Sequence, residues 1–353
     1  MHGLNRPVTR QLPPIAQRRP TFFVHHGVEL VDEYAWLRAG NWQEVMRDPS
    51  VLDQQIRAYL EAENAHTDAA LTDTGELQSA LYAEMKARIK EDDSSVPAPD
   101  GAHEYFVSYV TGGQYPRLCR RPRSGGGEDQ ILLDGNKEAE GKPYWQLGAA
   151  AHSPDHRYLA YAVDKKGSEL FTIKIRDLAT GKDLREALPE TRSSIIWGAD
   201  SQTLFYVRLD RNQRPLYVYR HRLGTPGKSD VLIYEEKDKG FYVGVGQTQS
   251  SRFVTIEAHD HQTTEIYLID AHRPESDPRL VAPREHGHEY AVEHHGDALI
   301  ITTNSGGAED FRICEAPLVD PQRSNWREMI PHKPGRLILE TVAFSGHLVR
   351  LER

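Results

Sequence analysis

The 353-residue sequence contains few of the features that would assign its class directly. Cysteine occurs only at Cys119 and Cys314, so we expect two buried thiols in a reducing compartment rather than a disulfide framework. No window approaches the roughly 18 consecutive apolar residues of a membrane span, and residues 1–20 lack the apolar core of a signal peptide. The formal net charge of −9 disfavours nonspecific nucleic-acid binding. These absences predict a cytoplasmic protein that binds neither membrane nor nucleic acid.

The short motifs of common chemistries are also missing. No serine stands in Gly-x-Ser-x-Gly, and the sequence has no phosphate loop, no dinucleotide fingerprint and no Cys-x-x-Cys pair. We therefore expect no catalytic residue, no metal ligand and no cofactor-binding residue within this chain.

What the sequence does contain is a repeat of apolar runs. The runs are marked by Leu159, Leu204, Phe253, Leu299 and Leu348, at steps of 45, 49, 46 and 49 residues. Each complete run is followed by a second β-rich run, at residues 170–173, 216–219, 266–269 and 311–314. A fixed period of about 40 to 50 residues made of short strands is typical of a β-propeller.

The character of the runs favours a propeller over a β-sandwich. Residues 159–163 and 299–301 are nearly continuously apolar, as expected for strands covered on both faces. With Phe106 marking a first blade, the chain holds about five units and the start of a sixth at Leu348. We therefore predict a mainly β fold, a seven-bladed-type propeller that is incomplete in this chain. Its last apolar face would be uncovered, which predicts aggregation of the isolated chain.

The first quarter of the chain reads differently. We expect an N-terminal arm and helices over residues 1–96 and the propeller over residues 97–353, because residues 97–101 form a Pro- and Gly-containing turn cluster. Asp48-Pro49 predicts one helix start. Asp73 with Glu76 predicts a capping box for a second helix.

That second helix carries one apolar stripe at a spacing of four residues: Leu77, Leu81, Met85 and Ile89. The stripe needs a partner surface. The propeller and a surface outside this chain are both open possibilities.

Three polar clusters could carry function, and each also has a structural interpretation. His286 and His288 could share a metal but lack an obvious third ligand, and His294 would lie too far along a strand to join them. A turn and strand with solvated or capped imidazoles fits this stretch better. The run of residues 117–123 contains four arginines, which suits either a phosphate site or a solvated edge strand. The carboxylates of Glu235, Glu236 and Asp238 could perform acid–base work, recognise a cationic peptide, or lie in a polar loop.

Three segments follow one another along the chain: residues 24–38 (with His25-His26-Gly27 and Asp32-Glu33-Tyr34-Ala35-Trp36-Leu37-Arg38), residues 88–97, and Tyr105-Phe106. Together they resemble the prolyl oligopeptidase family of serine peptidases. Residues 233–238, 264–268 and 288–290 are similar to the oligopeptidase B branch of that family.

The resemblance implies a seven-bladed propeller seated on an α/β-hydrolase domain that carries a Ser-Asp-His triad. It also implies that the N-terminal helices pack with the hydrolase, that the propeller limits access to short peptides, and that cleavage follows Arg or Lys. This chain lacks the hydrolase domain, so no catalytic or specificity residue can be assigned to it. We therefore predict the propeller portion of such a peptidase, inactive alone, whose partners are short basic peptides and the missing hydrolase domain. The alternative is a non-catalytic propeller scaffold that binds proteins or peptides.

Overall fold

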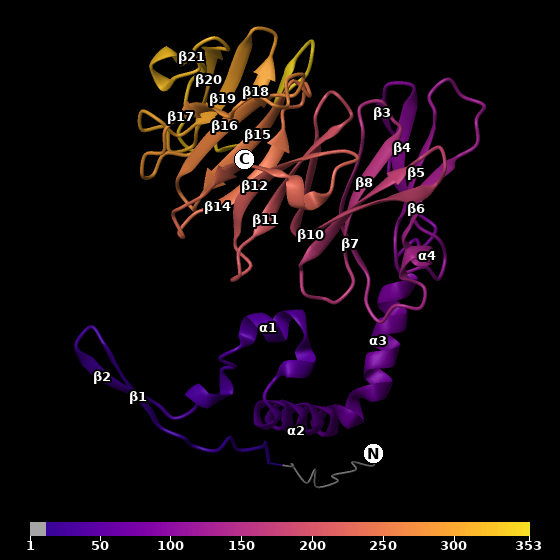
Figure 1. The fold of residues 1–353 in the computed structure, drawn as a ribbon, viewed down its shortest axis with the longest axis vertical. Coiled ribbons are helices and arrows are strands. Elements are labelled where there is room, and N and C mark those ends of the chain that lie inside the picture. Colours follow the sequence, from indigo (N-terminus) through magenta and orange to yellow (C-terminus); the bar gives the residue numbers. More distant parts are fainter. Residues whose placement is uncertain (1–11) are drawn as a thin grey trace, which may run out of the picture. The chain divides into compact units, whose positions relative to one another are not determined.

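The computed structural model describes residues 12–353. The chain forms two compact units (Figure 1). The first contains the residues up to Ala98 together with Phe106–Pro116, and the second contains Pro99–Tyr105 and Arg117–Arg353. The division into residues 1–96 and 97–353 stays a prediction, and part of the predicted N-terminal arm lies outside the described residues.

The first unit contains a short hairpin followed by helices. Its elements are β1 (Thr21–His25), β2 (Val28–Asp32), η1 (Ala35–Leu37), α1 (Trp42–Arg47), η2 (Pro49–Val51), α2 (Gln54–Leu71), η3 (Thr72–Thr74) and α3 (Gly75–Ala87). The strands β1 and β2 pair antiparallel, and all their residues are exposed.

The predicted helix starts are both wrong in detail. Asp48 caps only the 3-10 turn η2, because Leu52 then returns to an extended conformation, and α2 begins after Asp53 instead. The Asp53 carboxylate accepts hydrogen bonds from two backbone N–H groups of the first turn of α2. The capping box at Asp73 does not form, because this residue lies in the turn η3 and α3 begins after Thr74 without a side-chain cap. In both cases a short 3-10 turn shifts the start of the α-helix.

The apolar stripe of the second predicted helix is present and uncovered. Leu77, Leu81 and Met85 lie on α3 and are 60%, 46% and 59% exposed, and Ile89 follows the helix with 67% exposed. No residue of α3 is buried.

The second unit is built from successive antiparallel sheets. The first sheet has the order β3-β4-β5-β6, with β3 (Ala98–Asp100), β4 (His103–Ser108), β5 (Arg117–Pro122) and β6 (Gln130–Asp134), followed by α4 (Gly135–Ala139). A seven-stranded sheet follows, with β7 (Gln146–His152), β8 (Tyr158–Asp164), β9 (Phe171–Asp177), β10 (Lys182–Trp197), β11 (Thr203–Leu209), β12 (Pro215–Arg222) and β13 (Val231–Glu235).

The remaining sheets continue the pattern. They are β14 (Tyr242–Gln247), β15 (Phe253–His259), β16 (Thr264–Asp270) and β17 (Arg279–Ala282); then β18 (Tyr290–His295), β19 (Ala298–Thr303), β20 (Arg312–Pro317) and β21 (Arg327–Ile330); and finally β22 (Ile338–Ala343) with β23 (Leu348–Glu352). The turns η4 (Gly227–Ser229) and η5 (Arg323–Asn325) lie between strands.

The seven-stranded sheet consists of two blades that share one long strand. The first part of β10 pairs with β9, its second part pairs with β11, and Thr191 pairs with residues of both neighbours where the register shifts. Counted this way, residues 98–353 contain five four-stranded blades and a sixth blade of two strands. The predicted fold class is confirmed.

The markers of the sequence repeat all lie on the second strand of their blade. Leu159, Leu204, Phe253, Leu299 and Leu348 belong to β8, β11, β15, β19 and β23. Every residue of β8 is buried, which explains why its sequence shows no alternation.

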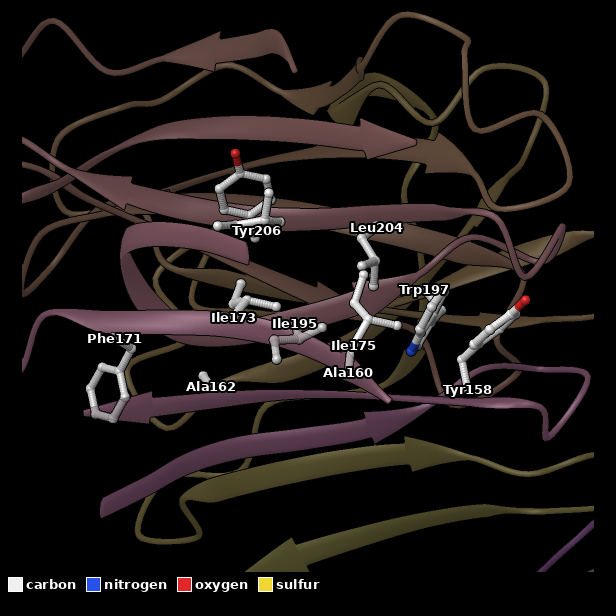
Figure 2. Close-up of a cluster of buried hydrophobic side chains, with 11 residues drawn as sticks. Tyr158, Ala160, Ala162, Phe171, Ile173, Ile175, Ile195, Trp197, Leu204 and Tyr206 are labelled. Atoms are coloured by element: carbon white, nitrogen blue, oxygen red, sulfur yellow. The ribbon is translucent and has the colours of Figure 1, made fainter. Parts of the chain in front are cut away.

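The core between the second and third blades shows how apolar side chains of neighbouring blades pack together. Ala160 and Ala162 of β8 leave room for the larger Ile173 and Ile175 of β9 (Figure 2). Beside them, the rings of Tyr158 and Trp197 stack with centroids 6.4 Å apart. The Trp197 indole N–H donates to the backbone oxygen of Ala151 at 2.9 Å, so the ring's polar atom is satisfied inside the core.

Candidate functional site

The carboxylate cluster at Glu236 is occupied by an arginine of the chain itself. Glu236 follows β13, Glu265 lies on β16, and Arg284 follows β17. The Arg284 Nη2 donates to Glu236 Oε2 at 2.6 Å and to Glu265 Oε2 at 3.0 Å. The guanidinium carbon of Arg284 also lies 4.0 Å from the ring centre of Phe241. This cluster therefore joins two neighbouring blades.

The charges of this cluster stabilise one another. Burial alone would raise the pKa of Glu236, but hydrogen bonds from Arg284 and from the backbone N–H of Asp238 hold that pKa below its ordinary value. Burial likewise opposes the charge of Arg284, and the two carboxylates outweigh it and raise the pKa of this guanidinium. Because Glu236 is buried and paired, it is not free to bind a cationic peptide. Glu235 is exposed, and Asp238 accepts a backbone hydrogen bond from Gly240, as expected of the polar loop.

The arginine run lies in the interior of its sheet, so the edge-strand interpretation is wrong. β5 lies between β4 and β6. Arg117 pairs with Asp134 at 2.9 Å and Arg121 pairs with Glu104 at 2.9 Å. Arg120 donates to Gln130 Oε1 at 2.8 Å and to the backbone oxygen of His156 at 2.6 Å. These side chains are therefore held by the protein rather than displayed as a phosphate-binding patch.

The histidines of residues 286–295 do not converge. His288 precedes β18 and is buried, with its Nε2 at 3.0 Å from Thr303 Oγ1. His286 is exposed. His294 lies on β18 with its Nδ1 at 2.8 Å from Ser250 Oγ. The structure thus brings none of the three into a shared ligand set.

The two hydroxyl–imidazole contacts do not form a hydrolytic triad. A triad needs a carboxylate that orients the second ring nitrogen of the histidine. The Nδ1 of His288 is buried without a hydrogen-bond partner, and His294 hydrogen bonds to the backbone of Gly296. Within residues 12–353 no carboxylate hydrogen bonds to either ring, so neither contact activates its hydroxyl.

A different cluster, which the sequence reasoning missed, does converge. Asp100 ends β3, His152 ends β7, and His156 lies in the turn between β7 and β8. One ligand atom from each residue can be chosen so that all three lie within 4.8 Å of one another. His152 Nε2 is 3.3 Å from Asp100 Oδ2. We call Asp100, His152 and His156 the seam cluster, because it joins the first sheet to the second.

Aromatic side chains and a backbone carbonyl hold the seam cluster. The ring of Tyr105 stacks on His152 with centroids 3.9 Å apart, and its hydroxyl is 2.8 Å from His156 Nδ1. His152 Nδ1 is 3.2 Å from the backbone oxygen of Ser153. Burial lowers the pKa of His152 and raises that of Tyr105. The ring of His103 packs on His156 at 5.1 Å, and its Nδ1 is buried without a partner.

The sequence carried only a weak signal for this cluster. Its two histidines are four residues apart, but the turn between them is a common Ser-Pro-Asp signal, and the carboxylate lies about 50 residues earlier in the turn cluster at residue 100. Sequence spacing could not show that two blades bring these segments together. Cys119 and Cys314 are both buried and are not joined by a disulfide. No helix in the described part of the chain is long and apolar enough to cross a membrane.

Comparison with known proteins now identifies the class. The family described as "Prolyl oligopeptidase, N-terminal beta-propeller domain" matches residues 13–353. The chain belongs to this family of peptidases.

Comparison with individual relatives indicates which branch of the family the chain resembles. Over 97% of its length the chain is similar to the structure of oligopeptidase B from Leishmania major, with a TM-score of 0.88 and 27% identity. It is also similar to oligopeptidase B from Trypanosoma brucei with covalently bound antipain, with a TM-score of 0.87, 30% identity and the same coverage. Dipeptidyl aminopeptidase BI of Pseudoxanthomonas mexicana is 34% identical across 99% of the chain.

The predicted resemblance to the oligopeptidase B branch is confirmed. The chain covers 49% of each of the two solved oligopeptidase B chains and 50% of the aminopeptidase. It therefore spans about half the length of these relatives.

Proposed function

We propose that this chain is the propeller portion of an oligopeptidase B-like serine endopeptidase that cleaves short peptides after Arg or Lys. The observation that carries the proposal is the match to oligopeptidase B over 97% of this chain but only 49% of the other. The catalytic α/β-hydrolase with its Ser-Asp-His triad would lie outside these 353 residues, which contain no Gly-x-Ser-x-Gly. On this account the isolated chain is inert, and the peptidase acts in the cytoplasm.

In this proposal the propeller limits which substrates reach the catalytic centre. The first strands β7 and β14 are edge strands of their sheets and carry small residues, including Gly148, Gly244 and Gly246. A Cβ on Gly148 would lie 2.5 Å from Phe171 Cε1, so close packing behind the strand also requires glycine there. Strands with small side chains would suit the lining of a central channel that admits extended peptides and excludes folded proteins.

The exposed stripe of α3 would be the surface that meets the hydrolase. Leu77, Leu81 and Met85 expose contiguous apolar area that nothing in the first unit covers. Apolar surface of this kind marks an interaction site in a stable protein. This gives the N-terminal helices a role in joining the two portions of the peptidase.

Two competing functions make different predictions. The aminopeptidase relative suggests removal of N-terminal dipeptides in place of internal cleavage. A non-catalytic scaffold would bind peptides and hydrolyse none.

The test is to read the gene beyond the codon for Arg353 and assay the complete encoded protein. A continuous segment that encodes Gly-x-Ser-x-Gly, together with cleavage of an N-terminally blocked peptide after internal Arg or Lys, would support the proposal. Cleavage only of peptides with a free N-terminus, two residues at a time, would favour the aminopeptidase. Absence of such a segment, with peptide binding but no hydrolysis, would favour the scaffold and contradict the proposal.

A further inference from the structure

We propose that the seam cluster, Asp100, His152 and His156, is a binding site for a divalent transition-metal ion of the zinc type. Its donor set of two imidazoles and one carboxylate is typical of zinc sites that keep an open position for water. Around a tetrahedral Zn²⁺, ligand atoms at about 2.0 to 2.2 Å from the metal lie about 3.4 Å from one another. The 3.3 Å between His152 Nε2 and Asp100 Oδ2 matches that separation. One possible ligand atom of each residue lies within 4.8 Å of the other two, so His156 is within reach of the same ion.

The hydrogen bonds of His152 leave the correct nitrogen available. A backbone carbonyl can only accept, so the 3.2 Å contact with the Ser153 oxygen places a proton on Nδ1. In the neutral ring, Nε2 then carries a lone pair, which faces the Asp100 carboxylate oxygen. Two acceptors face each other, and a cation between them resolves the conflict. A ring nitrogen fixed by a carbonyl on one side and free on the other is the usual arrangement of metal-binding histidines.

His156 can offer its Nε2 when its Nδ1 carries the proton. That Nδ1 lies 2.8 Å from the Tyr105 hydroxyl oxygen, which can accept the Nδ1–H, and Nε2 then keeps a lone pair for a metal. Gly101 packs against that nitrogen, because a Cβ at this position would lie 2.5 Å from His156 Nε2. The positive φ of 55° at Gly101 also favours glycine. Glycine at this position therefore lets the turn after β3 pass close to His156 without a side chain that would displace the ring.

The donor atoms of the seam cluster select the type of ion. The site has one carboxylate, and the fixed guanidinium of Arg120 contacts the backbone of His156. Ca²⁺ and Mg²⁺ require several oxygen ligands, which this set does not offer. Imidazole nitrogens prefer Zn²⁺, Ni²⁺ and Cu²⁺. The Asp100 side chain is 58% exposed, so an ion can enter from solvent.

A bound ion would link the first blade to the second, since Asp100 ends β3, His152 ends β7 and His156 lies in the turn before β8. We therefore expect metal binding to raise the thermal midpoint of the second unit by mass action. This inference does not depend on the proposed peptidase function.

The experiment is calorimetric titration of the chelator-treated chain with Zn²⁺, Ca²⁺ and Mg²⁺, repeated with Co²⁺ while its visible absorption is recorded. We expect one Zn²⁺ per chain, no Ca²⁺ or Mg²⁺ binding, and a Co²⁺ spectrum typical of nitrogen ligands. H152A and H156A should lose this binding, and Y105F should weaken it by about 10- to 100-fold because it removes the hydroxyl that holds His156.

Two further variants keep the result interpretable. H286A removes an exposed histidine outside the cluster and should bind Zn²⁺ like the unmodified chain. D100N changes an exposed side chain, so it should keep the metal-free thermal midpoint and still weaken binding at least tenfold. Absence of Zn²⁺ binding, or binding that D100N, H152A and H156A leave intact, would overturn the proposal.

Discussion

Two leucines that belong to regular apolar patterns, one in each unit, differ in how far they are buried. Leu204 on β11 is 1% exposed, because it packs in a core cluster with side chains of β8, β9 and β10. Leu81 on α3 is 46% exposed, although its stripe is just as regular. The difference teaches that periodicity reports a need for a partner surface but not where that surface lies. In the propeller a neighbouring repeat provides it, whereas the helices of the first unit leave their apolar stripe exposed.

The largest effect should come from truncating one leucine of each kind. Leu204→Ala leaves a cavity between two packed blades and should lower the free energy of unfolding by about 3 to 5 kcal/mol. Leu81→Ala removes exposed atoms and should change it by no more than about 0.5 kcal/mol. Urea denaturation followed by circular dichroism measures both. Equal losses would show that the stripe is already buried in the isolated chain and would end the contrast.

Arginines sharpen the same comparison. Arg284→Met leaves Glu236 and Glu265 buried without their cation and should cost about 3 kcal/mol. Arg88→Met breaks an ion pair with Glu84 that is exposed on both sides, and it should have no measurable effect. Thermal midpoints of the two variants test this. A loss at Arg88 as large as that at Arg284 would contradict the assignment of the buried cluster.

A smaller effect should follow pH. The pKa of Glu236 is held below its ordinary value of 4.5, so its ion pair contributes stability that is fully present above pH 4.5. That contribution is lost as the pH falls through the depressed pKa, because the carboxylate takes up a proton. The unmodified chain should therefore be more stable than Glu236→Gln at pH 7, and the gap should narrow below pH 4.5. Urea midpoints of both proteins across this pH range test the prediction. A stability difference that widens in acid would contradict it.

The smallest effect should be local to the first unit. Asp53→Ala removes the cap of α2 and should cost that helix about 1 kcal/mol, whereas Asp48→Ala affects only the 3-10 turn before it. Amide hydrogen exchange should show faster opening of α2 in the Asp53 variant alone, with β8 and β11 unchanged. If Asp48→Ala opens α2 to the same extent, the helix starts where the sequence first suggested.

The sequence predicted the repeated strands well because their signal is local. A strand covered on both faces must be apolar throughout, and Leu159 and Leu299 report that condition directly. The helix starts were less predictable, because Asp48 and Asp73 have the chemistry of caps but stand before 3-10 turns. A side chain that can cap does not determine which turn it caps.

Side-chain partners across blades could not be predicted at all. Glu236 reads as a loop residue until Arg284, 48 positions later, folds against it. Asp100 and His156 likewise meet only because the first and second sheets adjoin. Such contacts depend on how repeats stack, which spacing within one repeat does not encode.

The most direct test of the central claim is an activity measurement on the purified 353-residue chain. It combines a fluorogenic peptide that ends in Arg with a fluorophosphonate probe that labels activated serines. If this chain is the propeller portion of a peptidase whose catalytic serine lies outside it, neither hydrolysis above a protein-free control nor labelling should occur. Hydrolysis accompanied by labelling of a serine within these residues would contradict the account.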